Sequence, residues 1–209
     1  MLSAFVNTFK IPELRQRILF TLGLIFICRL ISIVPTPGVD TYALQQAIRE
    51  FEQKVGGGFL VWVDLFSGGA LGQCAVGALS IWPYISASII LQMMTAIIPA
   101  LGRLAKEGDA GRAKLVQYTR YFTLVICIVQ GFFLARTLEN PSALGINTDI
   151  VIAPGWPFRI LTVLTMTAGT MVLMWLGEQI TERGIGNGIS IVITVNIVSR
   201  IPEAIVAAY

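Results

Sequence analysis

The chain has 209 residues, of which 55% are hydrophobic and only 13% are charged, and its formal net charge is +3. This composition, with a mean hydropathy of +0.76, is typical of an integral membrane protein. The sequence contains no histidine, which excludes Ser-His catalysis and His-rich metal sites. Cys28, Cys74 and Cys127 lie in apolar stretches without close spacing, so we expect small buried side chains rather than metal ligands.

The N-terminal part of the chain predicts one membrane span between two surface segments. Residues 1–17 form an amphipathic segment that we expect at the membrane interface, with a solvated tail as the alternative. Residues 18–34 are apolar and long enough to cross a bilayer. Arg29 lies near the far end of this span, where its charge can reach the interface or pair inside a helix bundle. A turn and a short surface helix over residues 41–54 follow.

Residues 59–98 are apolar nearly throughout, yet a single helix of this length would be about twice as long as a bilayer core is thick. Glycines interrupt the middle of the stretch. We therefore divide it into a short glycine-rich piece, residues 60–74, and a span, residues 75–98, which Pro83 is expected to kink. The short piece cannot cross the membrane. Because such a segment is tolerated at membrane depth only inside protein or beside a water-filled cavity, we expect it to fill an interior.

One face of the span over residues 75–98 carries isoleucines at helical spacing. Ile81, Ile85 and Ile89 stand four residues apart and share that face. Such a stripe is either ordinary packing or lipid-facing surface, or a hydrophobic constriction that seals a pore. The spacing alone leaves both alternatives open. Gln92 and nearby serines add polarity, which suits an interface that sometimes meets water.

The second half of the chain predicts three more spans. Residues 99–120 are the most basic stretch, and their glycines indicate an exposed loop rather than a helix. Spans are expected over residues 121–138, 158–176 and 189–206. The glycine-rich residues 177–188 could cradle an anion, but no strand precedes them and no Gly-Lys-Ser/Thr follows, so a tightly packed turn is favoured.

The basic residues gather on one side of this predicted topology, which the positive-inside rule makes the cytoplasmic side. The N-terminus is therefore expected in the cytoplasm, and the short piece enters from outside. The basic residues of the cytoplasmic side are Lys10, Arg15, Arg17, Arg103, Lys106, Arg112, Lys114, Arg120 and Arg183. Those of the opposite side are Arg49, Lys54, Arg136, Arg159 and Arg200.

An odd number of spans leaves the two ends of the unit on opposite faces of the membrane. Many transporter folds pair such a unit with an inverted copy. Nothing within the chain repeats on that scale, so the chain predicts one half of a larger assembly. A solute-transporter half that acts as an inverted homodimer is the alternative, although no charge lies at midspan in the broken segment to form its substrate site.

Five motifs spread along the chain resemble those of a single family. They are VPTPGVD (34–40), DLFSGGAL (64–71), WPYISASIILQ (82–92), KEGDAGRAKLVQYTRY (106–121) and MWLGEQITERGIGNGIS (174–190). The family is SecY, the central subunit of the Sec protein translocon. The resemblance implies an all-α polytopic membrane protein with five transmembrane helices and a short re-entrant plug helix. This would be one inverted-repeat half of a ten-helix channel, so we expect the chain to be the N-terminal half of a longer protein.

The resemblance also implies roles for particular residues. The span over residues 75–98 matches one side of the lateral gate, and Ile89 belongs to that gate rather than to the pore ring. The plug, residues 60–74, includes Leu65, Phe66, Ser67, Gly68, Gly69, Ala70 and Leu71. The pore ring receives Ile81, Ile85 and Ile193, and the gate receives Ser86, Ile89, Ile90 and Gln92. Arg112 and Arg120 match a basic loop that contacts cytoplasmic partners.

The function implied by the resemblance is a protein-conducting channel rather than an enzyme. Such a channel moves unfolded secretory proteins across the membrane and releases transmembrane segments sideways into lipid. Neither a cofactor nor a metal nor a catalytic residue is expected. The implied partners are the SecE and SecG subunits, the SecA motor ATPase, the translating ribosome, signal sequences, nascent polypeptides and membrane lipid, with no direct contact to nucleic acid. The implied location is the inner membrane of a bacterium.

Overall fold

The computed structural model describes residues 11–55, 67–141 and 150–207, and this part of the chain contains helices but no strand. Only two isolated β-bridges occur in it, Pro35 with Ala75 and Val39 with Val151. The helices are α2 (Pro12–Ile33), α3 (Thr41–Val55), α5 (Trp82–Ile97), α6 (Pro99–Lys106), α7 (Asp109–Glu139), α8 (Trp156–Arg183) and α9 (Gly188–Ala207). The expected all-α class is thereby confirmed for the described residues.

Proline marks the start of four of these helices. Pro12 and Pro99 are the first residues of α2 and α6, and Pro83 and Pro157 are the second residues of α5 and α8. Proline suits these positions because the first N–H groups of a helix have no intrahelical partner. The expected kink at Pro83 is therefore wrong, since this residue lies in the first turn of α5 and removes no helical hydrogen bond.

Three of the described helices, α2, α7 and α8, are long and apolar enough to cross a membrane. The pair α5 and α6 counts as a fourth if it is one broken span, although its two parts meet at 103°. The apolar part of α9, Gly188–Ser199, is shorter than a span. Three to four spans thus follow from length and hydropathy in the described residues, and the fifth stays a prediction.

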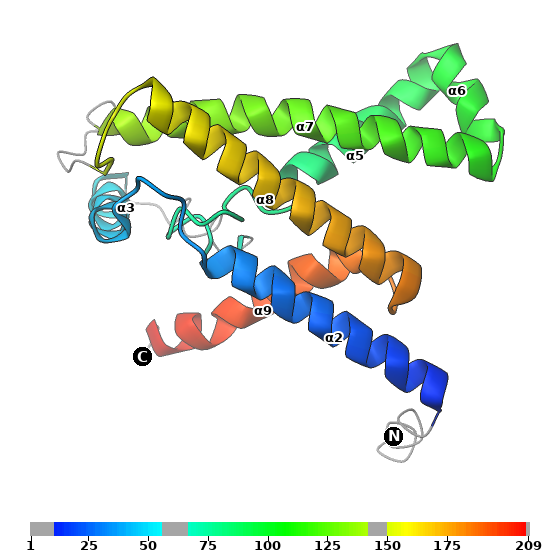
Figure 1. Cartoon of the computed structure of the whole chain (residues 1–209), viewed down its shortest axis with the longest axis horizontal. Helices are drawn as coiled ribbons and strands as arrows, with labels where there is room; N and C mark the ends of the chain where they lie inside the picture. The colour runs from blue at the N-terminus through cyan, green and yellow to red at the C-terminus, as the bar shows by residue number, and fades with distance from the viewer. Residues whose placement is uncertain (1–10, 56–66, 142–149, 208–209) are drawn as a thin grey trace.

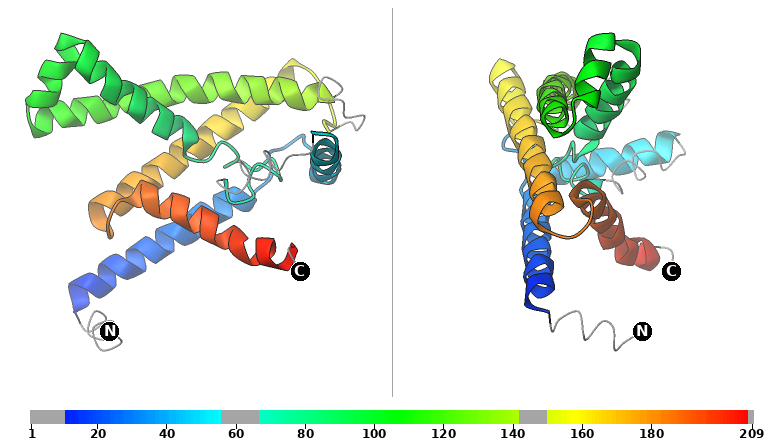
Figure 2. Two further views of the ribbon diagram at one scale, coloured as in Figure 1. Left: turned by 180° about the vertical axis from the view of Figure 1, so that it is seen from behind. Right: turned by 90° about the vertical axis from the view of Figure 1, so that its right-hand side faces the viewer.

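Helix α8 lies at the centre of the molecule and contacts α2, α7 and α9 (Figure 1). Helix α5 packs on α7, and α6 closes the turn between them. The side view in Figure 2 shows α2 and α8 nearly in line on one side, with α3 and α9 extending away from them. Two apolar clusters fill the centre. One joins α3, the end of α7 and the start of α8, and the other joins α2, α8, α9 and the start of α5.

The surface helix expected over residues 41–54 is confirmed as α3. Its start is determined by Asp40, whose Oδ1 accepts hydrogen bonds from the N–H groups of Tyr42 (2.9 Å) and Ala43 (3.2 Å). A carboxylate at this position satisfies orphan donors of the first turn. Leu44 and Ala47 are buried on the inner face of α3, and Tyr42 is exposed.

Three expected boundaries are wrong. The span predicted to begin at residue 75 begins at Trp82, because residues 68–81 are turns in which Ser80 has a positive φ of 52° that no α-helix accommodates. The basic stretch 99–120 is not a loop but α6 and the start of α7. There Gly111 allows close packing rather than breaking the helix, since a Cβ would lie on the Leu104 carbonyl.

The third wrong boundary is the end of α8, which continues through residues predicted as turn until Arg183. The remaining turn is tightly packed, as expected. The N–H of Gly188 donates to Thr181 Oγ1 (2.9 Å), and Asn187 Oδ1 accepts from the N–H groups of Ile189 (3.1 Å) and Ser190 (3.4 Å). Asn187 therefore caps α9 instead of facing an anion.

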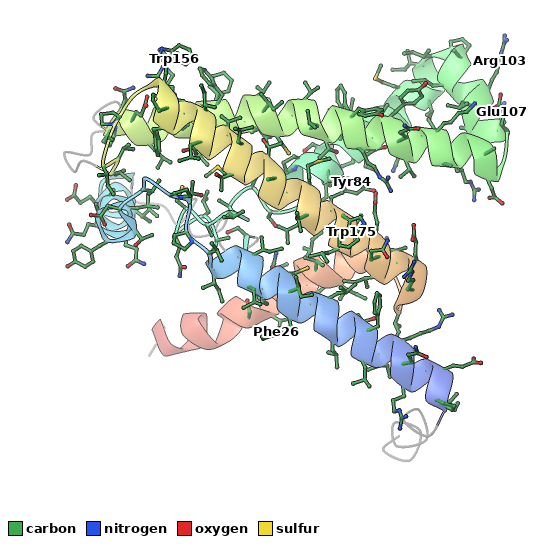
Figure 3. The ribbon with its side chains drawn as sticks, in the orientation of Figure 1. Phe26, Tyr84, Arg103, Glu107, Trp156 and Trp175 are labelled. Carbon is green, nitrogen blue, oxygen red and sulfur yellow. The ribbon has the colours of Figure 1, made fainter. Side chains whose placement is uncertain are left out.

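The basic flanks lie at one end of the molecule. The starts of α2 and α7, the helix α6 and the end of α8 all lie at the right in Figure 1, whereas α3, the end of α7 and the start of α8 lie at the left. Figure 3 shows Arg103 at the first end and Trp156 at the other. This arrangement agrees with the sidedness that the charge pattern predicts, and the side that faces the cytoplasm stays a prediction.

Candidate functional site

Residues 67–81, hereafter the central segment, lie in the middle of the molecule, and after Ser67 their backbone consists of turns with one isolated β-bridge at Ala75. They lie between α2, α8 and α9, drawn in teal in Figure 1. Gly68 and Gly69 have φ values of 69° and 89°, and Cys74 and Ser80 have φ values of 46° and 52°. Non-glycine residues rarely adopt such a φ, and those that do are held by their surroundings. The segment is therefore shaped by its contacts rather than by helix formation.

The central segment is buried or half-buried except at Gln73, and several of its backbone groups find partners within the protein. Its hydrogen bonds to the turn after α2 run from Thr36 N–H to the Cys74 carbonyl (2.9 Å) and from Val76 N–H to the Val34 carbonyl (2.8 Å). Within the segment, Ala75 N–H donates to the Ala70 carbonyl (2.8 Å). Non-helical backbone is tolerated among membrane helices only under these conditions.

A glycine on α8 allows the central segment to approach closely. A Cβ atom at Gly169 would lie on the Val76 carbonyl oxygen and 2.7 Å from Val76 Cγ1. Gly77 faces the same helix, and its Cβ would lie 3.4 Å from Leu173 Cδ1. The segment and α8 thus touch through backbone, which leaves no room for larger side chains.

Arg29 of α2 reaches into the interior and joins three elements. Its Nη1 donates to the Gly68 carbonyl (3.4 Å), and its Nη2 donates to the Val195 (2.7 Å) and Asn196 (3.4 Å) carbonyls of α9. Nη2 also bonds to Ser199 Oγ. Of the two alternatives for Arg29, pairing inside the bundle is therefore confirmed.

A second polar contact ties the other end of the central segment to α9. Asn196 is 5% exposed, and its Nδ2 donates to Ser80 Oγ at 3.4 Å. Ser80 is one of the serines near Pro83 that the sequence marks as polar, whereas no role was predicted for Asn196. Asn196 is the one amide side chain in α9, and a polar side chain at membrane depth is a signal of function that could have found it.

The predicted pore-ring residues are only partly brought together. Ile81 is 1% exposed and lies in the apolar cluster with Cys28 of α2, Leu173 of α8 and Val192 of α9, and Ile85 packs against it. Ile193 is half-buried and is not a member of that cluster. Among Ile81, Ile85 and Ile89, exposure rises along α5 to 53% at Ile89.

The predicted gate residues lie on α5, and most of their side chains are exposed. Ile89 and Ile90 are exposed, Ser86 is half-buried, and the exposed Gln92 donates from Nε2 to Ser88 Oγ (3.2 Å). They continue an exposed apolar surface along the helix. Its other members are Trp82, Met93 and Ile97.

Of the predicted plug residues, Leu65 and Phe66 lie outside the described part of the chain. Ser67 begins the central segment, and its Oγ accepts from Leu71 N–H (3.1 Å). Ala70 is completely buried, and Leu71 packs against the apolar cluster of α3, α7 and α8. The described plug residues therefore belong to the central segment and follow its path inside the protein.

The two arginines predicted to contact partners differ in their surroundings. Arg112 is exposed in the first turn of α7. Arg120 makes a bidentate ion pair with Glu178 of α8, from Nε to Oε1 (3.1 Å) and from Nη2 to Oε2 (2.6 Å). Its guanidinium thus holds two helices of the same chain together. In the described residues, no three His, Cys, Asp or Glu side chains are grouped so that they could hold a metal ion.

Comparison with known proteins finds a family and close relatives. A family model described as SecY matches residues 75–209. The "Protein translocase subunit SecY" of Streptomyces griseus is 48% identical over 208 residues, which are 98% of this chain and 47% of the relative. The subunits of that name from Thermotoga maritima and Escherichia coli K12 are 45% and 46% identical, covering 100% and 92% of this chain and 48% and 42% of their own lengths. The chain spans about half the length of the curated relatives it matches.

Proposed function

Since this chain belongs to the SecY family, we propose that it forms part of a protein-conducting channel in a bacterial inner membrane. Unfolded secretory proteins cross through this channel, and transmembrane segments leave it sideways into lipid. The observation that carries the proposal is the central segment, a buried, non-helical stretch in the middle of long apolar helices.

Residues 60–74, whose described part is the first half of the central segment, act as a plug that blocks the channel in its resting state. Three properties support this role. The described residues 67–74 are mostly buried or half-buried, several of their backbone groups bond within the protein, and Gly68, Gly69 and Cys74 have positive φ values. This part can leave as a unit, because Leu71 is the one large apolar side chain among the described residues 67–74.

The apolar cluster that contains Ile81 and Ile85 supplies one side of a constriction, and Ile193 supplies a further side chain. An isoleucine side chain has no charge and forms no hydrogen bond, so it does not hold a passing polypeptide. Polypeptides of any sequence can therefore slide through the constriction. The pore is passive in this proposal. The ribosome, or the SecA motor with the proton-motive force, supplies the driving energy.

The exposed face of α5, with Ser86, Ile89, Ile90 and Gln92, forms one side of a lateral gate. Its mixture of isoleucine with polar groups suits a surface that meets a hydrophobic signal sequence, lipid and water in turn. The remaining partners are SecE and SecG in the membrane, with SecA or the ribosome on the cytoplasmic side, where Arg112 is available as a contact. An inverted homodimer of solute-transporter halves is not favoured, because the relatives are named as protein translocase subunits.

The plug assignment is tested by deleting residues 60–74 from the full-length protein and measuring ion conductance in planar bilayers. We expect a raised resting conductance and acceptance of substrates with altered signal sequences. Tyr42→Ala, on the exposed face of α3, serves as the surface control and should leave both unchanged. A deletion variant as tight and as selective as the parent protein would refute the assignment.

A further inference from the structure

We propose that Arg29 is the positioning residue that holds the central segment in its resting place by joining it to α9. The inference rests on the function proposed above and assigns a residue to one of its steps. Arg29 lies on α2, and its guanidinium bonds to Gly68 at the start of the central segment and to Val195, Asn196 and Ser199 on α9. One side chain therefore connects three elements that are far apart in sequence.

Arginine is suited to this position by its geometry. The guanidinium is planar, stays charged and presents five N–H donors in fixed directions, so it can serve carbonyl groups on two sides at once. Lysine would offer a single nitrogen. The carbonyl of Gly68 and those of Val195 and Asn196 are served by different nitrogens of the group, Nη1 and Nη2.

Gly68 is shaped to fit this contact. A Cβ atom there would lie 2.7 Å from Arg29 Nη1 and 3.2 Å from both Cβ and Oδ1 of Asn196, and its φ is 69°. A side chain at residue 68 would therefore push the guanidinium and α9 away. At the other end of the segment, the hydrogen bond between Asn196 and Ser80 ties the segment to the same turn of α9.

The strength with which Arg29 holds the segment depends on whether water has entered the interior. While the interior is dry, the segment cannot leave α9 without stripping carbonyl acceptors from a charged group, which is costly at membrane depth. Once a substrate chain has admitted water, the guanidinium is solvated and the hold is weakened. Arg29 thus stabilises the closed state in the resting protein. Its hydrogen bonds to the segment weaken once the channel begins to open and water enters.

The first test is Arg29→Gln in the full-length protein, with resting conductance in planar bilayers as the readout. We expect resting open probability to rise about tenfold or more, which corresponds to the loss of one hydrogen bond to a charged group. Gly68→Ala disturbs the same contact from the segment side and should act in the same direction. Gly23→Ala on α2, whose Cβ would meet nothing within 4 Å, is the matched control and should leave conductance unchanged.

A cross-link separates positioning from a general folding defect. Gly68→Cys and Asn196→Cys are introduced together with Arg29→Gln in a background without the native cysteines. The Cβ positions lie 3.2 Å apart, close to the separation of about 3.5–4.5 Å in disulfides, and the shorter glutamine leaves room for the new side chain. We expect the oxidised protein to be closed and the reduced protein to leak, a reversal that a misfolded channel would not show.

The deletion of residues 60–74 is measured in parallel. If the deletion raises conductance and Arg29→Gln does not, the plug stands and the role of Arg29 is overturned. If Arg29→Gln leaks but oxidation of the cysteine pair does not close the channel, Arg29 acts elsewhere and the inference is again overturned. If neither the deletion nor Arg29→Gln leaks, the proposed plug function fails and the inference fails with it.

Discussion

Single glycine residues determine how closely the helices approach the central segment. At Gly169 of α8 the neighbour is the backbone of Val76, with Val76 Cγ1 2.7 Å and the Val76 carbonyl carbon 2.8 Å from the place where a Cβ would lie. Gly23 of α2 has no neighbour within 4 Å of that place. The two glycines look alike in the sequence, since both lie inside apolar helices, and they differ only in what faces them.

This difference predicts opposite results for the same substitution. Gly169→Ala forces α8 and the central segment apart and should lower the free energy of unfolding by about 1–3 kcal/mol, the usual cost of overpacking. Gly23→Ala should be neutral or stabilising by up to about 1 kcal/mol, because alanine favours the helix. Thermal unfolding midpoints of the two purified variants in one detergent check the prediction. Equal midpoints would contradict the close approach at Gly169.

Helices α7 and α8 are the element pair that organises the molecule, and an ion pair ties each of their ends. Glu139 at the end of α7 binds Arg159 Nε (2.6 Å) and accepts from Gly155 N–H (2.8 Å), with 4% of its side chain exposed. At the other end, Glu178 binds Arg120, and this pair is the more exposed one, with 11% and 44% of the two side chains exposed against 4% and 26% for Glu139 and Arg159. Arg159 also lies over the Trp156 ring, 5.3 Å from its centroid.

The difference in exposure predicts a difference in stability. Glu139→Gln removes a buried charged acceptor that serves two donors, and it should cost about 1–3 kcal/mol of unfolding free energy. Glu178→Gln breaks a pair screened by water and should cost less than about 1 kcal/mol. The measurement is the thermal midpoint of each variant relative to the parent protein. A larger fall in the thermal midpoint for Glu178→Gln than for Glu139→Gln would show that burial does not determine which ion pair contributes more to stability.

At the scale of the whole molecule, basic residues lie at one end of the protein, and exposed apolar residues lie along its sides. The basic flanks lie at one end, with α3 at the other (Figure 1). Along the sides, α2 and α5 expose large apolar residues, which suits lipid or further protein in a membrane. They include Leu19, Leu22, Phe26, Ile89, Met93 and Ile97.

The sidedness can be measured with cysteine labels. Lys114→Cys lies at the basic end and Tyr42→Cys lies on α3, and both positions are exposed. In intact bacteria, a membrane-impermeant maleimide should label Tyr42→Cys, and it should label Lys114→Cys only after the membrane is opened. The native Cys28, Cys74 and Cys127 are at most 4% exposed and should stay unlabelled. Labelling of both positions from the same side would refute the orientation.

The sequence by itself determined those features of the fold that depend only on residues close together in the chain. Hydropathy indicated a helical membrane protein, residues 41–54 indicated α3, and glycines indicated that the stretch 59–98 would be broken. These properties are local, because helix starts, turns and apolar runs are encoded within a few residues.

Only the tertiary structure decided the rest. It begins α5 at Trp82, because the residues before it include Cys74, hydrogen-bonded to Thr36 after α2, and Ser80, hydrogen-bonded to Asn196 of α9, both in a conformation that no α-helix contains. It turns Arg29 inward to carbonyls 166 and 167 residues further along the chain, and it pairs Arg120 with Glu178 of α8. A charged side chain can be recognised in a sequence, but its partner is determined by which segments the fold brings together.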